Sequence, residues 1–354
     1  MIVLVKISKI FQRRKAQLLL GFLLLIICCD HPNNQIVIKG LTMGTSYVVK
    51  VISDKNIESE KIKYSIDSIL VKLNEQMSTW DPESEISRFN RWESLEPYDV
   101  SEQFYEVVES ALNLSKKTNG MFDATVFDLL SLWGFGPNPK SGIPEKKNIE
   151  SILTFTGYEN IICSNGSLVK KNQRAKLDLN AIAKGYGVDV VFNFLRNMGF
   201  ENIFVEIGGE VRFSGYNFRN KNWSIGLENP PSNQIEKQIP FFGILKNEEC
   251  AIATSANYRN FVDLDGTILG HTINPKSGFP IQSNVLSVTV ISKTCIEADG
   301  WATALMTMSY EEGVSILSGD DNISAIWLMR DADGLRYINM EGNIDILDHI
   351  YDIR

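Results

Sequence analysis

The chain has 354 residues, of which 44% are hydrophobic, and a formal net charge of −8. The length exceeds that of a small disulfide-stapled scaffold, and the apolar content suffices to bury a core, which excludes a disordered tail. Residues 1–28 hold five cations and no acids, so the remainder carries 30 cations against 43 acids, a balance of −13. We expect such an acidic body to have no nucleic-acid partner.

The N-terminus has the pattern of an export signal. A basic stretch precedes an apolar run over residues 18–27, which is too short to span a bilayer and typical of a signal peptide. The run ends at two cysteines and continues into polar residues, as in a bacterial lipoprotein. We expect residues 1–28 to be the lipoprotein signal peptide, 29–35 the lipidated tether and 36–354 the folded domain.

The two cysteines offer two lipidation sites. A lipoprotein signal places a small residue directly before the acylated cysteine, which favours Cys29, with Cys28 in the small position. Cys28 as the acceptor, and a signal anchor with two incidental cysteines, are the alternatives. An acylated, palmitate-bearing cysteine would tether the protein to a membrane of the bacterial cell envelope, facing the periplasm or the exterior. The other cysteines, Cys163, Cys250 and Cys295, lack metal-binding spacing and are expected to be buried free thiols.

In chain order, the first predicted elements are two strands and two helices. Residues 35–52 alternate apolar and polar side chains around the turn-like Met43-Gly44-Thr45, which predicts two strands. Apolar residues at helical spacing predict a helix over 57–76. A second helix is predicted over 101–118, ending at Asn119-Gly120.

Hairpins dominate the rest of the chain. A loop from residue 133 leads to a helical stretch near Ile149, and Asn165-Gly166 predicts a hairpin between 161–163 and 167–170. A helix over 181–198 is predicted to end at Gly199. Further strands are predicted at 203–207, 211–213, 224–227, 251–254, 260–264, 267–271 and 286–291, then a helix over 295–308, another helix, a strand at 326–329 and a final hairpin. This order predicts one α+β domain of antiparallel sheets with packed helices.

One segment is typical of a different enzyme class. Phe261-Val262-Asp263-Leu264-Asp265-Gly266-Thr267 resembles the nucleophile motif of haloacid-dehalogenase-type phosphatases. That fold carries the motif on the first strand of a parallel sheet, whereas this segment lies near the C-terminus. We therefore expect a hairpin with Asp265-Gly266 as its two-residue turn. Neither a P-loop nor a dinucleotide-binding glycine fingerprint is present in the sequence.

Asp299 and Thr303 are the first candidates for chemistry. They are four residues apart in a predicted helix, so both oxygens project from one face. A carboxylate with a hydroxyl suits Mg²⁺, which usually keeps waters and takes the rest of its shell from phosphate oxygens. Taken alone, the pair is more typical of a solvated helix start, with the aspartate near the N-cap.

A second candidate segment is the run from Asp178 to Gly187. It places polar groups at a strand-to-helix junction, with Lys184 about one turn into the helix, so helix N–H groups and one lysine could hold an anion. An exposed helical lysine is the alternative. His271 is the one histidine of the body away from the chain ends, and it is either structural or a proton acceptor.

These segments resemble one family when taken in order. The resemblance covers about residues 40–310 and rests on Met43-Gly44-Thr45, Ser78-Thr79-Trp80, Gly120-Met121-Phe122-Asp123, Trp133-Gly134-Phe135-Gly136, the 178–187 run, Glu206-Ile207-Gly208-Gly209, Thr254-Ser255-Ala256-Asn257-Tyr258, His271-Thr272-Ile273-Asn274-Pro275 and the 298–305 run. The sequence is thereby similar to the FAD:protein FMN transferases, also called ApbE-type lipoproteins. This similarity implies a T-fold-like domain over 36–354.

The resemblance implies a reaction and a set of site residues. Such enzymes use Mg²⁺ to cleave FAD, attach FMN to a threonine of an exported flavoprotein and release AMP. By residue, the flavin contacts would be Met43, Trp80, Met121, Phe122, Asp123, Asp178, Lys184 and Ile273. The metal ligands would be the Ala181 carbonyl, Asp299 and Thr303, and His271 is the candidate acceptor of the threonine proton. Trp80 replaces a common tyrosine, and Asn274 replaces the aspartate of the His-x-x-Asp-Pro pattern.

Two other functions remain open at this point. An FAD pyrophosphatase would use the same site with water as the nucleophile and release FMN and AMP. A non-catalytic surface lipoprotein could store or deliver flavin, although it would not need the metal-binding face of Asp299 and Thr303.

Overall fold

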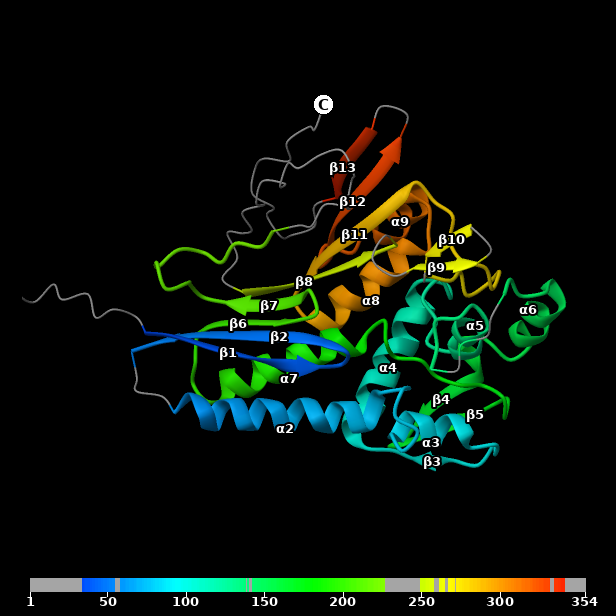
Figure 1. Ribbon diagram of the computed structural model, residues 1–354, viewed down its shortest axis with the longest axis horizontal. Coiled ribbons are helices and arrows are strands. Elements are labelled where there is room, and N and C mark those ends of the chain that lie inside the picture. Colours follow the sequence, from blue (N-terminus) through cyan, green and yellow to red (C-terminus); the bar gives the residue numbers. More distant parts are fainter. Residues whose placement is uncertain are drawn as a thin grey trace, which may run out of the picture.

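The computed structural model of the chain is shown in Figure 1. It describes residues 34–54, 58–137, 139, 142–226, 249–257, 261–264, 267–270, 272–331 and 334–340. The predicted signal peptide, Cys28, Cys29 and His271 lie outside these residues. Asn34 and Gln35, expected in the tether, already pair with Ser53 and Ile52 in the first hairpin, so the folded domain includes them.

The centre of the fold is an eight-stranded sheet in which every neighbouring pair is antiparallel. Its strand order is β1-β2-β6-β7-β8-β11-β12-β13. The strands are β1 (Asn34–Thr42), β2 (Thr45–Ser53), β6 (Asn202–Ile207), β7 (Glu210–Ser214), β8 (Glu249–Ala256), β11 (Val285–Ser292), β12 (Ser324–Asp331) and β13 (Gly334–Met340). The predicted antiparallel α+β class is confirmed.

Three helices cover one face of this sheet. α2 (Ser59–Met77) packs against β1, while α7 (Ala183–Asn197) and α8 (Cys295–Met306) pack against each other and against the central strands (Figure 1). Their apolar residues join those of the sheet in the main core. A smaller apolar cluster around Trp223 lies on the opposite face. The α7–α8 pair is therefore held rigidly under the middle of the sheet.

The remaining elements surround one end of the α7–α8 pair. They are helices α3 (Glu85–Arg91), α4 (Glu102–Lys117), α5 (Phe127–Leu132), α6 (Lys146–Leu153) and α9 (Tyr310–Leu317), the 3₁₀ turn η1 (Tyr158–Asn160), a small sheet of β3 (Tyr98–Asp99), β5 (Ser167–Lys170) and β4 (Ile161–Ser164), and the pair β9 (Phe261–Leu264) and β10 (Thr267–Gly270). Most of these segments match the predicted elements. The short helices α3 and α5 were not predicted.

The structure tests two predicted strand segments, the hairpin over 260–271 and the strand over 224–227. β9 and β10 pair antiparallel with Leu264 opposite Thr267, which confirms the hairpin and contradicts the dehalogenase motif, although the turn itself lies outside the described residues. The predicted strand over 224–227 is reduced, in its described part, to a single β-bridge residue, Ile225.

The cysteines and the hydropathy give two further results. Cys250 and Cys295 are buried free thiols as expected, whereas Cys163 is only half-buried. Within the described ranges, no helix has the length and apolar character needed to cross a bilayer.

Candidate active site

A cleft of about 820 Å³ opens beside the N-terminal half of α7. All the predicted flavin and metal residues that the structure describes line it: Met43, Trp80, Met121, Phe122, Asp123, Asp178, Ala181, Lys184, Ile273, Asp299 and Thr303. They come from segments that are far apart in the sequence. His271 lies outside the described residues, but its neighbours Thr272 and Ile273 line the cleft.

Asp299 lies in the middle of α8, with its carboxylate turned toward α7. Its Oδ2 accepts a hydrogen bond of 2.9 Å from the backbone N–H of Gly185, and its Oδ1 is 3.8 Å from Nζ of Lys184. Thr303, one helical turn further on, lines the same cleft. The predicted common face of Asp299 and Thr303 is confirmed.

Gly185 makes this contact possible because the two helices nearly touch there. A Cβ atom at Gly185 would lie 2.3 Å from the carbonyl oxygen of Cys295 and 2.7 Å from Cβ of Asp299. Both atoms belong to helix backbone or to its first side-chain carbon, so they cannot move aside. Only glycine lets the Gly185 N–H reach the Asp299 carboxylate.

Lys184 is held by acids. Its Nζ donates to Oε1 of Glu210 at 2.9 Å and also faces Asp299. Burial alone would lower the pKa of Lys184, but the carboxylates of Asp299 and Glu210 raise it above its ordinary value. The lysine therefore stays protonated in the cleft, with its charge shared between two carboxylates.

Glu210 is a site residue that the sequence did not reveal. It is 4% exposed, and its Oε2 has no hydrogen-bond partner among the described residues. Burial raises the pKa of its carboxyl to about 7; Lys184 opposes this shift, and Asp299 adds to it. The only signal was an acid directly after the turn at Gly208-Gly209. The site thus combines one cation with two closely spaced carboxylates.

Asp123 and Asp178 shape the cleft wall through hydrogen bonds. The Asp123 carboxylate accepts from the backbone N–H groups of Thr125 at 2.7 Å and Tyr158 at 2.8 Å. Asp178 accepts from the backbone N–H of Asn180 at 2.9 Å and from its side-chain amide at 3.0 Å. Burial raises the pKa of each carboxyl to about 6, against these hydrogen bonds. Each acid fixes a loop that lines the cleft.

The remaining wall is apolar and aromatic. Met43 has a left-handed φ of 48° in the β1–β2 turn, a conformation that costs a non-glycine residue energy and is frequent at functional sites. Phe122 and Ile273 are buried, while Trp80 is 63% exposed at the rim. Such a wall suits a planar ring system.

Asn274 has a structural role that explains one departure from the family pattern. Its Oδ1 accepts hydrogen bonds from the backbone N–H groups of Lys276 at 2.9 Å and Ser277 at 3.0 Å. An asparagine provides this acceptor as an aspartate would. The loop that follows His271 therefore keeps its turn without a charge.

The donors around Asp299 fit a hard cation. In the part of the chain that the structure describes, no three or more His, Cys, Asp or Glu side chains are grouped to hold a metal. The candidate centre instead has one carboxylate, the Thr303 hydroxyl and the Ala181 carbonyl along the cleft, with the unpartnered Oε2 of Glu210 nearby. Few protein oxygens and an open cleft suit Mg²⁺, which binds through one or two carboxylates together with water and phosphate oxygens.

Comparison with known proteins shows which family the chain resembles over most of its length. The family model described as the ApbE family matches residues 43–327. The FAD:protein FMN transferase of Vibrio cholerae is 40% identical over 90% of this chain and 94% of its own length, and that of Haemophilus influenzae is 34% identical over 86% and 89%. The solved structure of the flavin transferase ApbE from Vibrio cholerae superposes with a TM-score of 0.80 at 38% identity, covering 87% of this chain and 97% of its own.

Proposed function

The chain belongs to the ApbE family, and from this membership we propose that it transfers FMN from FAD to a threonine side chain of a protein acceptor. The threonine oxygen bonds to the FMN phosphorus, the bond from that phosphorus to the AMP oxygen breaks, and AMP leaves. The single observation that carries the proposal is that one cleft joins an apolar wall to a Lys184–Glu210–Asp299 cluster.

The flavin half of FAD fits the apolar part of this cleft. The volume of about 820 Å³ lies within the range of small-molecule sites. Met43, Met121, Phe122 and Ile273 provide the apolar surface, and the exposed Trp80 provides an aromatic face at the rim for stacking. The ring system would thus be held between loops whose shape Asp123 and Asp178 maintain.

The pyrophosphate belongs at the charged end. Mg²⁺ would be held by Asp299, the Thr303 hydroxyl and the Ala181 carbonyl, and when bound it supplies positive charge to the phosphate oxygens. The chain itself orients Asp299 through the N–H of Gly185 and keeps Lys184 protonated. Lys184 can then stabilise charge that develops on the phosphate oxygens.

The acceptor threonine must lose a proton during the transfer. His271 is the proposed base, because the next two residues line the cleft and an imidazole accepts protons near neutral pH. The acceptor protein provides the nucleophile, so the cleft needs no nucleophilic side chain of its own.

We propose that the protein is located in the cell envelope. The apolar run over 18–27 followed by Cys28 and Cys29 supports a lipid-anchored enzyme whose acceptor is an exported flavoprotein subunit. Replacing Cys29 by serine should release the protein from membranes or leave its signal uncleaved. Continued acylation of the variant would instead assign the lipid to Cys28.

One experiment tests the reaction. The protein without its signal peptide is incubated with FAD, Mg²⁺ and a candidate flavin-carrier domain. The intact mass of the carrier domain is then measured. We expect one FMN on a carrier threonine and an equal amount of AMP, and no mass increase when that threonine is alanine. AMP with no covalent flavin on any carrier would indicate a pyrophosphatase. FAD binding without either product would indicate a storage protein.

A further inference from the structure

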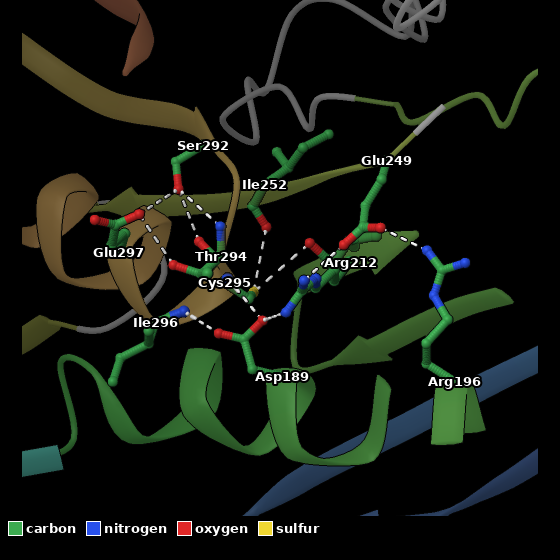
Figure 2. Close-up of polar contacts among 11 residues, drawn as sticks. Asp189, Arg196, Arg212, Glu249, Ile252, Ser292, Thr294, Cys295, Ile296 and Glu297 are labelled. Carbon is green, nitrogen blue, oxygen red and sulfur yellow. Dashed lines mark hydrogen bonds and ion pairs between the residues drawn. The ribbon is translucent and has the colours of Figure 1, made fainter. Parts of the chain in front are cut away.

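The start of α8 is fixed by a residue of α7. Thr294, at the N-cap position, makes no side-chain capping hydrogen bond to the helix N–H groups. Asp189 of α7 replaces it: its Oδ1 accepts from the backbone N–H of Cys295 and its Oδ2 from that of Ile296, both at 2.9 Å (Figure 2). The helix that carries Asp299 is thus capped from a neighbouring helix.

The Asp189 carboxylate is itself held in place by a chain of ion pairs. Arg212 of β7 donates to Oδ1 of Asp189 at 2.6 Å and to Oε1 of Glu249 of β8 at 2.6 Å. Glu249 Oε2 in turn pairs with Arg196, further along α7, at 2.5 Å (Figure 2). The guanidinium of Arg212 also lies over the ring of Phe192, 4.3 Å from its centroid. Asp189 therefore has little freedom to move away from α8.

Two contacts between the helices form a register. Asp189 follows Gly185 by four residues on α7, and Cys295 precedes Asp299 by four residues on α8. The contacts Asp189–Cys295 and Gly185–Asp299 are therefore two rungs one helical turn apart between antiparallel helices. One rung defines a single point of contact, whereas two rungs one turn apart define both the axial position and the rotation of α8 relative to α7.

We propose that Asp189 is a positioning residue for the cation site, which it sets by locking the register of α8 against α7. The proposal rests on the proposed function, because that function gives Asp299 and Thr303 their role. Asp189 does not line the cleft and touches neither of these residues. A shift of α8 by a fraction of an ångström would change the spacing between the Ala181 carbonyl, which lies just before α7, and the Asp299 and Thr303 oxygens of α8.

A local network that does not involve Asp189 also holds the residues at the start of α8. Thr294 Oγ1 donates to Glu297 Oε2 at 3.0 Å, and the Thr294 N–H donates to Ser292 Oγ at 3.2 Å. Loss of the Asp189 acceptors should therefore loosen the register more than it unfolds the helix. Asp189 can be tested by substitution in a folded protein.

The test compares Asp189→Ala and Asp189→Asn with Glu297→Gln, which removes a carboxylate from the same helix start and leaves both rungs intact. Mg²⁺ binding is measured by calorimetry with AMP present, and transfer is measured over a range of Mg²⁺ concentrations. We expect Asp189→Ala to weaken Mg²⁺ binding about tenfold, the lower end of the loss caused by removing a residue that supports a metal site, with little change in the KM for FAD. Asparagine keeps one acceptor oxygen, so its effect should be intermediate, and Glu297→Gln should bind Mg²⁺ as the unaltered protein does.

Unchanged Mg²⁺ binding in Asp189→Ala, with only a lower melting temperature, would overturn the proposal and leave a purely structural role. The same experiment distinguishes a failure of this proposal from a failure of the proposed function. If the proposed function is wrong, the unaltered protein transfers no FMN, while calorimetry still reports whether Asp189 affects Mg²⁺ binding.

Discussion

Two ionic clusters meet on α7, and they differ in how completely their carboxylates are paired. In the rear cluster, Asp189 and Glu249 use both oxygens in hydrogen bonds or ion pairs with backbone N–H groups and arginines. In the cleft cluster, Oε2 of Glu210 has no partner among the described residues, and the nearest described cation to Oδ1 of Asp299 is 3.8 Å away. Unsatisfied acceptors cost stability, so their presence beside a cleft indicates that a ligand completes them.

The largest effect on transfer is expected at Gly185, where α7 and α8 approach each other most closely. Gly185→Ala would place a Cβ 2.3 Å from the carbonyl oxygen of Cys295, so α7 and α8 must separate. We expect transfer to fall below detection and the melting temperature to drop. Gly187→Ala is the matched control, because its Cβ would meet only the side-chain ends of Met43 and Ile207, at 3.2 and 3.4 Å. Equal behaviour of the two variants would contradict the importance of the close approach.

Asp299→Ala should separate function from stability. Transfer should fall about a hundredfold or more, because the variant loses the only carboxylate that we assign to the cation. Lys184 keeps Glu210 as its partner, so the melting temperature should change little. Steady-state transfer and thermal unfolding measured side by side check both expectations. Normal turnover at limiting Mg²⁺ would exclude this cation site.

Glu210→Gln and Glu249→Gln should act in opposite ways. Glu210→Gln should slow transfer about tenfold, since Lys184 loses a charged partner. Its free energy of unfolding should stay equal or rise, because a buried carboxylate with an unpartnered oxygen is removed. Glu249→Gln should leave transfer nearly unchanged, because Arg212 still pairs with Asp189. It should cost about 1 kcal/mol of unfolding free energy, as expected for a partly exposed ion pair. Chemical denaturation and transfer rates are measured for both variants. Slower transfer in Glu249→Gln together with lower stability in Glu210→Gln would contradict the distinction between the two clusters.

Trp80 should affect binding alone. Its ring is 63% exposed, so Trp80→Ala should not change the melting temperature. The KM for FAD should rise about fivefold to tenfold through loss of aromatic stacking, and Trp80→Tyr should restore most of the affinity. An unchanged KM in the alanine variant would place the flavin elsewhere.

Lys170 provides a buried cation outside both clusters, and it should have no effect on transfer. Its Nζ lies 3.4 Å from the carbonyl oxygen of Asn90 and 4.8 Å from the ring centroid of Phe89. Burial, aided by the nearby Lys176, lowers the pKa of Lys170 from 10.5 to about 8. Lys170→Met should therefore raise the free energy of unfolding at pH 7 by on the order of 1 kcal/mol.

The pH dependence of this difference follows from the same pKa. Between about pH 8 and 10.5 the unfolded chain holds more protons than the folded one, so the unaltered protein gains stability as the pH rises. The advantage of Lys170→Met should shrink over that range in chemical denaturation experiments. A constant difference from pH 7 to 10 would show that the fold does not lower the pKa of Lys170.

The sequence predicted what depends on local geometry. The common face of Asp299 and Thr303 follows from helical spacing, and the Asn165-Gly166 hairpin follows from turn chemistry. The helices α3 and α5 were missed because seven and six residues provide too few turns for a clear apolar periodicity. Of the strand predicted over 224–227, the described residues form only one β-bridge, at Ile225.

The sequence predicted which residues line the site, but not the contacts that these residues make with distant parts of the chain. The motif resemblance named the residues that line the cleft, because each motif is local. Glu210 was missed since its role depends on β7 lying beside α7, which no local pattern contains. The same holds for Asp189, whose partners Cys295 and Ile296 are more than one hundred residues away along the chain.

If Cys29 carries the proposed lipid, the edge strand β1 limits how far the cleft can stand from the membrane. It spans nine residues, about 30 Å at the usual rise of a strand, and its far end leads directly into Met43 at the cleft. With the proposed lipid on Cys29, the five residues 29–33 extend at most about 17 Å further. The cleft can then stand no more than about 50 Å from the bilayer surface, so only acceptors whose threonine comes within that height can be served.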